Sequence, residues 1–155
     1  MGLFGRKKEP RRHKGGVAEL VPVPDMADLP KAKLQSPAKY LGTLTESGEK
    51  VVGQSLSVQS SARLNLAPVG IDVVRMAGSF RIPAEAMRGA TTGEEFAGKR
   101  VESLLVVRWE HDDQPWRTGF RMDVSKNIKS GPSAPDVDQW VRTISKMARK
   151  AGETK

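Results

Sequence analysis

Residues 101–124 read VESLLVVRWEHDDQPWRTGFRMDV, and this stretch carries the strongest structural signal in the chain. Residues 101–110 are apolar at both alternating sets of positions, which is typical of a strand with neighbours on both sides, so we place it centrally in a sheet. Residues 116–124 alternate strictly, and one face consists of Trp116, Thr118, Phe120, Met122 and Val124. The five residues between the two runs, 111–115, predict a hairpin loop.

Shorter apolar runs, each broken by turn residues, precede this hairpin. They predict strands at 40–45, 62–67, 71–76 and 79–82, with a weaker candidate at 51–58. With the hairpin this makes six or seven short strands. No parallel crossover unit is expected, because no helical pattern separates the runs.

The C-terminus changes to a helical period. One amphipathic stripe is formed by Val137, Trp140, Val141, Ile144 and Ala148. Asp136 and Gln139 have the spacing of a capping box at the start of the helix. The pattern predicts a mainly β protein: a bent antiparallel sheet or barrel of about seven strands, closed by one C-terminal α-helix with Trp140 as its structural anchor.

The positive charge belongs to the two ends of the chain. Of the net charge of +8, residues 1–16 supply +5 (six Lys/Arg, one Glu) and residues 142–155 supply +4 (five Lys/Arg, one Glu). Residues 39–141 are neutral, with 13 basic and 13 acidic side chains. A neutral body argues against a broad nucleic-acid footprint on the folded domain. The absence of cysteine excludes disulfides, thiolate zinc sites and a cysteine nucleophile.

The start of the chain differs in composition from the rest. Residues 1–16 are mainly Gly, Lys and Arg, which cannot bury enough apolar surface to offset the entropy of ordering. Prolines follow at positions 22, 24 and 30. We therefore expect a disordered basic arm and linker at 1–37, one domain at 38–150 and a disordered tail at 151–155. No apolar run reaches the length that spans a bilayer.

Several short motifs resemble a known family. They are YLGT at 40–43, SARL at 61–64, FRIPAEAMRG at 80–89, GK at 98–99, LVVRW at 105–109 and TGFR at 118–121. In this order they resemble the actinobacterial pleckstrin-homology-like (PH-like) domain proteins, which are often encoded near pyrimidine and carbamoyl-phosphate synthesis genes. The resemblance covers about residues 39–124 and implies the PH-like fold. Typical members begin with a membrane-spanning helix, whereas this chain begins with polar and basic residues.

Catalytic chemistry has little support in the sequence. His13 and His111 have no partner at the spacing of a triad or a metal site. The carboxylate pairs at 94–95 and 112–113 fall in polar loops, and no phosphate-binding glycine motif occurs. We predict that the chain is not an enzyme, holds no cofactor or metal and has no small-molecule substrate.

Two binding modes of related folds are also disfavoured. A phosphoinositide site would need several cations in the first hairpin loop, but residues 46–50 hold two Glu and one Lys. An exposed aromatic patch of Trp109, Trp116 and Phe120 is possible in principle. Aromatic residues at period two are more often packed in the core, and we assign these three to the core.

The basic arm combines an apolar pair with a cluster of cations. Its contact residues for a membrane or a polyanion are Leu3, Phe4, Arg6, Lys7, Lys8, Arg11, Arg12 and Lys14. At about 1 kcal/mol per cation near an anionic leaflet, six cations give a weak, reversible attachment of about 6 kcal/mol. The same charges fit nucleic-acid phosphates, although no stacking residues accompany them. A merely solubilising tail is the third interpretation.

The sequence thus predicts a non-enzymatic interaction or scaffolding domain. We expect an unidentified protein partner, with the chain in the cytoplasm and peripheral at the inner face of the membrane. The alternative is a nucleic-acid-associated accessory protein that binds through its basic termini.

Overall fold

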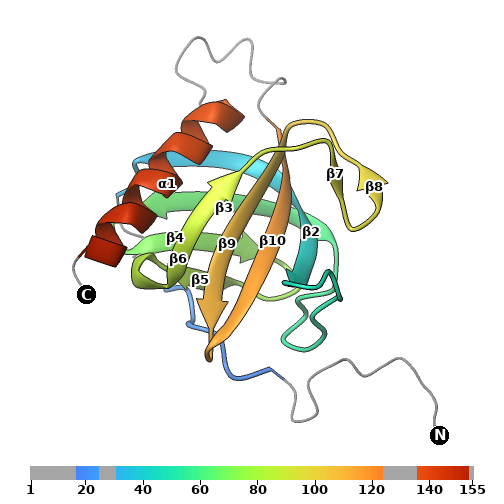
Figure 1. The fold of residues 1–155 in the computed structure, drawn as a ribbon. Coiled ribbons are helices and arrows are strands. Elements are labelled where there is room, and N and C mark those ends of the chain that lie inside the picture. The colour runs from blue at the N-terminus through green and yellow to red at the C-terminus, as the bar shows by residue number, and fades with distance from the viewer. Residues whose placement is uncertain (1–16, 25–30, 124–135, 154–155) are drawn as a thin grey trace, which may run out of the picture.

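The computed structural model describes residues 17–24, 31–123 and 136–153. In these residues seven antiparallel strands form a bent sheet in the order β5-β4-β3-β2-β10-β9-β6, and helix α1 packs at one end of it (Figure 1). The seven strands are β2 (Leu34–Thr45), β3 (Ser60–Ala67), β4 (Gly70–Arg75), β5 (Phe80–Pro83), β6 (Met87–Thr91), β9 (Leu104–His111) and β10 (Gln114–Met122). Strands β7 (Glu95–Phe96) and β8 (Lys99–Arg100) form a separate two-stranded hairpin. The 3₁₀ turn η2 (Ala84–Ala86) and helix α1 (Val137–Glu153) complete the fold.

The predicted fold class is confirmed, with two adjustments. The sheet ends at β5 and β6, which do not pair with each other, so it is bent but not closed into a barrel. Strand β9 has neighbours on both sides, β10 and β6, but the middle strand of the seven is β2. The most apolar strand is therefore one position from the sheet edge, where α1 covers its neighbour β6.

The hairpin between β9 and β10 is tighter than the sequence suggests. Gln114 pairs with His111 and Pro115 pairs with Glu110, so the predicted five-residue loop is wrong. Two residues make the turn, Asp112 and Asp113, with φ angles of 53° and 63°. Positive φ at both central positions matches the right-handed twist of the flanking strands, and short Asp side chains tolerate it.

The folded domain begins earlier than the expected residue 38. Strand β2 starts at Leu34, opposite Leu66 of β3. The carbonyl of Pro37 accepts a hydrogen bond from the Asp123 N–H, so the Pro37 nitrogen also points toward β10. The pairing of β2 with β10 ends at Ala38 and Met122, so no hydrogen-bond donor is needed from residue 37 and a proline is accommodated there. Leu20 is buried in the core. Residues 17–24 and 31–37 are thus part of the domain and not of a linker.

Further differences concern short elements. Residues 51–58 are not a strand but a looped segment that buries Leu56. The strands β6, β7 and β8 were not expected, because their sequences are short and carry little periodicity. At the other end, α1 continues to Glu153, so the expected tail does not begin at 151.

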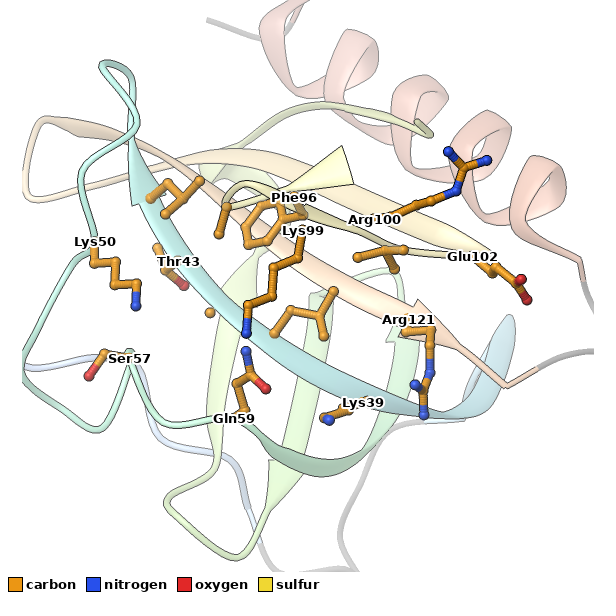
Figure 2. Close-up of a pocket in the computed structure, with 15 residues that line it drawn as sticks. Lys39, Thr43, Lys50, Ser57, Gln59, Phe96, Lys99, Arg100, Glu102 and Arg121 are labelled. Carbon is orange, nitrogen blue, oxygen red and sulfur yellow. The ribbon is translucent and has the colours of Figure 1, made fainter. Parts of the chain in front are cut away.

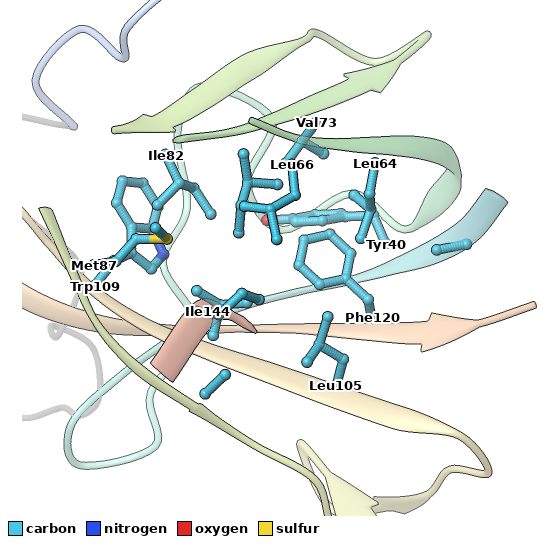
Figure 3. Close-up of a cluster of buried hydrophobic side chains, with 14 of the residues drawn as sticks. Tyr40, Leu64, Leu66, Val73, Ile82, Met87, Leu105, Trp109, Phe120 and Ile144 are labelled. Atoms are coloured by element: carbon cyan, nitrogen blue, oxygen red, sulfur yellow. The ribbon is translucent and has the colours of Figure 1, made fainter. Parts of the chain in front are cut away.

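The core lies inside the bend of the sheet, where side chains from both halves meet (Figure 3). Tyr40, Trp109 and Phe120 are at most 1 % exposed and pack together with aliphatic residues of β3, β4 and β5. Helix α1 closes this core with Trp140 and Ile144, both fully buried. The Gln139 N–H donates to the Asp136 carboxylate over 2.8 Å, which caps the helix as its sequence predicts.

Candidate functional site

The outer face of the sheet, opposite the core, is partly covered by the small hairpin β7–β8. Phe96 of β7 packs there in a second apolar cluster with Leu44, Leu104 and Val106. The hairpin can lie close because Gly119 has no side chain: a Cβ at this position would stand 2.8 Å from the Phe96 ring. Because Gly119 has no side chain, the ring of Phe96 can pack directly on the backbone of β10.

Beside this hairpin is a pocket of about 480 Å³. It lies between the hairpin, the outer face of β2 and β10, and the looped segment at 50–59 (Figure 2). Its polar lining consists of Lys39, Thr43, Lys50, Ser57, Gln59, Lys99, Arg100, Glu102 and Arg121. Its apolar lining consists of Leu41, Leu44, Phe96 and Val101, with Gly42 and Ala97 between them.

Five cations and one carboxylate line this pocket. This local excess of positive charge is not apparent from the zero net charge of residues 39–141. Lys39 on β2 and Arg121 on β10 are direct cross-strand partners, so their side chains leave the sheet on the same face. Lys99 comes from the hairpin, and Figure 2 shows it extending across the hollow toward Gln59. Arg100 and Glu102 are directed away from that hollow in the same view.

Among the residues that the structure describes, the cations of the pocket form no ion pair. Within the described residues, the ion pairs are Arg81 with Asp72 and Arg88 with Glu110, and neither pair lines the pocket. Lys39, Lys99 and Arg121 make no hydrogen bond in that part of the chain either. With five cations and one carboxylate, the described lining has an excess of positive charge, which makes the pocket chemically suited to an anion.

Catalytic groups do not converge anywhere in the described part of the chain. No group of three or more His, Asp or Glu there has the geometry to hold a metal. His111 ends β9, where its Nε2 lies 3.0 Å from the Ala18 carbonyl oxygen and its ring contacts Trp116. Asp112 and Asp113 form the hairpin turn, and Glu94 and Glu95 are exposed.

The structure describes only some of the site residues that the sequence predicts. The arm residues from Leu3 to Lys14, and His13 with them, lie outside the described residues. Trp140, on α1, is buried in the main hydrophobic core. The assignment of Trp109, Trp116 and Phe120 to the core is confirmed, since all three are at most 3 % exposed.

The pocket itself was missed from the sequence. The hairpin 95–100 gave too weak a signal to place, and the facing of Lys39 and Arg121 depends on the strand register. That register shifts at a bulge between Gly119 and Phe120. The sequence does place a cation at an outward position in each of these two strands, Lys39 and Arg121. The same pattern is common on solvent-exposed faces of sheets, so it does not by itself indicate a pocket.

A bent antiparallel sheet of seven strands closed by a C-terminal helix defines this chain as a pleckstrin-homology-like domain. The family model described as "Bacterial PH domain-like" matches residues 17–133, about three quarters of the chain, and the chain belongs to this family. The match begins at residue 17, which agrees with a domain that starts before residue 38. Domains of this family are in general non-enzymatic, and the match is compatible with an interaction domain.

Two further findings bear on function. A search of curated proteins finds no match to this sequence. Among the helices that the structure describes, none has the length and hydrophobicity that crossing a bilayer requires. That the chain is one of the actinobacterial proteins, with their genomic setting, stays a prediction from the sequence.

Proposed function

We propose that this chain is a non-enzymatic PH-like interaction domain that meets its protein partner at the cytoplasmic face of the membrane, with the basic arm as a reversible membrane contact. The observation that carries the proposal is a group of exposed apolar side chains at the end of the domain where residue 17 continues into the arm. The contacts described next support the view that the exposed apolar side chains and residue 17 lie at the same end of the domain.

Met76 is fully exposed at the turn between β4 and β5, and Val52 and Val58 are 43 % and 45 % exposed on the neighbouring looped segment. Arg75 joins these two segments, because its guanidinium donates to the carbonyls of Val58 and Gln54 over 3.2 and 3.3 Å. Exposed apolar side chains on adjacent loops are suited to the boundary between headgroups and acyl chains.

Residue 17 leaves the domain at the same loops. Its side chain packs on Gly53, where a Cβ would lie 3.0 Å from Val17 Cγ2. The Ala18 carbonyl oxygen lies 3.0 Å from His111 Nε2, beside the turn of β9 and β10. A membrane that the arm attracts would therefore meet this end of the domain first. Six cations at about 1 kcal/mol each, with Leu3 and Phe4, support weak and reversible binding.

Sedimentation with anionic vesicles tests this proposal. The full chain should bind at low salt and be released as salt screens the attraction. Met76→Ser and the pair Leu3→Ser with Phe4→Ser should each weaken binding, because they remove side chains that enter hydrocarbon. Val69→Ser is the matched control: Val69 is 46 % exposed but occupies the turn at the opposite end of β4. Equal loss in Met76→Ser and Val69→Ser would contradict the proposed orientation.

One observation favours the alternative, a nucleic-acid-associated protein. Helix α1 carries exposed cations at Arg142, Lys146, Arg149 and Lys150, which lie along one side of the helix. Binding of DNA or RNA through this stripe should fall with salt, and Lys146→Gln with Arg149→Gln should reduce the salt slope by about two. Such binding should be indifferent to Met76 and Leu3, so the two functions separate in the same set of variants.

A comparison of proteins captured with and without the basic arm tests for the protein partner. Affinity capture with the full chain and with a chain lacking residues 1–16 should recover the partner at the membrane fraction only with the full chain. Recovery by both forms from the soluble fraction would indicate a partner that does not need the membrane.

A further inference from the structure

The pocket beneath the β7–β8 hairpin holds a like-charged pair that the fold itself does not need. Lys39 and Arg121 face each other directly across β2 and β10. Like charges in this position destabilise a sheet, since their Cβ atoms stand about 5 Å apart. The described residues provide no carboxylate partner for either of them. A bound anion would turn this repulsion into a favourable interaction.

A third cation reaches the same place from another part of the chain. Lys99 belongs to the hairpin that Phe96 fastens to the outer face of the sheet. Figure 2 shows its side chain extending into the hollow between hairpin and sheet. The cations therefore surround a concave space, whereas cations on a merely solvated face would diverge into water.

The size and floor of the pocket limit the occupant. A volume of about 480 Å³ lies in the range of about 300–1,000 Å³ that small-molecule sites occupy. The floor is apolar, with Leu41, Leu44 and Phe96, so an inorganic ion alone would leave most of the space unused. The occupant should combine an anionic group with a less polar body.

An extended acidic peptide does not fit this site. Along the pocket, strand β2 pairs with β10 on one side; on the other side it pairs with β3 as far as Tyr40 and then with residues 49–51 of the looped segment. In the described residues only Leu41 and Gly42 of this strand lie between those two pairings, which is too short a stretch for a peptide to join as an added strand. A compact ligand with its charge concentrated in one group is the better match.

We propose that this pocket binds an organic phosphate. The phosphate group lies among Lys39, Lys99 and Arg121, and the less polar part lies over the apolar floor. A phosphate ester suits the site better than a carboxylate, because its several oxygens accept hydrogen bonds from cations on different sides and pair bidentately with arginine. A soluble phosphate ester and a lipid headgroup share this chemistry. The inference does not depend on the basic arm or on Met76.

Titration of the full chain with phenyl phosphate, followed by amide NMR shifts, tests the proposal. Shifts should concentrate in residues 39–44, 96–101 and 119–121. Phenyl phosphate should bind about tenfold more tightly than inorganic phosphate, because its ring adds contact with the apolar floor. Benzyl alcohol, which lacks the charge, should not bind. Equal affinity for the two phosphates, or shifts spread over all basic surfaces, would overturn the proposal.

Substitutions in the pocket separate a specific site from general charge. Arg121→Gln and Lys39→Gln should each weaken phenyl phosphate about tenfold or more. Arg63→Gln is the matched control, because Arg63 is exposed on the neighbouring strand β3 and does not line the pocket. The same loss in Arg63→Gln would show that only the overall charge matters, and the site would be refuted.

Competition then distinguishes the two sources of phosphate. Glycerol 3-phosphate should displace phenyl phosphate if the ligand is soluble, and vesicles of phosphatidic acid in phosphatidylcholine should displace it if the ligand is a headgroup. Displacement by neither would overturn the proposal. A chain lacking residues 1–16 should retain phenyl phosphate binding, so failure of the membrane proposal leaves this result unaffected.

Discussion

The two faces of the sheet at β2 and β10 follow opposite rules. On the inner face, buried hydroxyl groups of these strands have partners: the Tyr40 hydroxyl donates to the Leu56 carbonyl over 2.6 Å, and Thr118 Oγ1 accepts from Trp109 Nε1 over 2.9 Å. On the outer face, Lys39 and Arg121 make no hydrogen bond or ion pair within the described residues (Figure 2). The same two strands thus build stability on one side and leave uncompensated charge on the other.

Arg75 shows how this protein treats a cation that belongs to its fold. The guanidinium is buried, donates to three backbone carbonyls and lies 4.3 Å from the centre of the Tyr40 ring. Desolvation lowers the pKa of Arg75, and only the surrounding acceptors make this burial tolerable. The pocket cations have no such enclosure. This contrast is why we assign them to binding and not to stability.

The largest effect is expected where the helix closes the inner face. Trp140→Ala should lower the free energy of unfolding by about 3–5 kcal/mol, because the indole is fully buried against the core. Trp140→Phe should cost less, since the indole N–H has no hydrogen-bond partner in the described part of the chain. Urea unfolding measures both. A loss below about 1 kcal/mol in Trp140→Ala would mean that α1 is peripheral to the core.

The second effect is a loss of stability in alkali. Burial raises the pKa of Tyr40 from 10.0 to about 12, because the buried site disfavours the phenolate. A raised pKa means that the neutral form stabilises the folded state. Its contribution, roughly 2–3 kcal/mol, is complete below pH 10 and is lost as the pH rises through 12.

Tyr40 is the single tyrosine of the chain, so phenolate absorbance reports on this group alone. We expect it to titrate together with unfolding, and Tyr40→Phe to remove this alkaline transition. Titration near pH 10 in a protein that stays folded would show that the inner face is open to solvent at this point.

The sequence was sufficient for the parts of the fold that have a strong local pattern. The alternation at 116–124 and the apolar run at 101–110 predicted β10 and β9, and the stripe through Trp140 and Ile144 predicted α1. Errors arose where tertiary pairing overrides local signals. The linker was expected to extend to residue 37, yet β2 begins at Leu34 and includes Pro37, whose nitrogen faces a position where no strand needs a donor.

The pocket was not predictable for a related reason. It depends on Phe96 lying over Gly119 and on the register that sets Lys39 opposite Arg121. Each of these pairs is separated by at least 23 positions in the sequence, and neither partner has a distinctive pattern around it. The neutral charge count of the body also concealed the local excess of cations, because that count sums the charges over all residues from 39 to 141.

A third, smaller effect tests how the hairpin is attached to the outer face. Gly119→Ala should place a methyl group against the Phe96 ring, which would have to move away. We expect a loss of about 1–2 kcal/mol and faster amide exchange in residues 95–101, with exchange in β9 and β3 little changed. Gly93→Ala is the control without such crowding, since the nearest atom to a Cβ there lies at an ordinary contact distance of 3.7 Å and Gly93, like Gly119, has no positive φ. Uniform acceleration of exchange would mean that hairpin and core unfold together.

The smallest effect has the opposite sign and decides the comparison of the two faces. Arg121→Gln should raise the free energy of unfolding by a few tenths of a kcal/mol up to about 1 kcal/mol, because it removes repulsion with Lys39. Lys39→Gln should do the same, and the double variant should gain little more than either single one, since the repulsion can be removed only once. Added salt should stabilise the wild type more than the variants, because screening acts on the same repulsion. Cations with structural partners would behave differently. Removing each one would then lower the free energy of unfolding, and the effects of the two substitutions would add in the double variant. Thermal unfolding of the four proteins at low and high salt measures these differences, and destabilisation in either single variant would place Lys39 and Arg121 among the groups that hold the fold together.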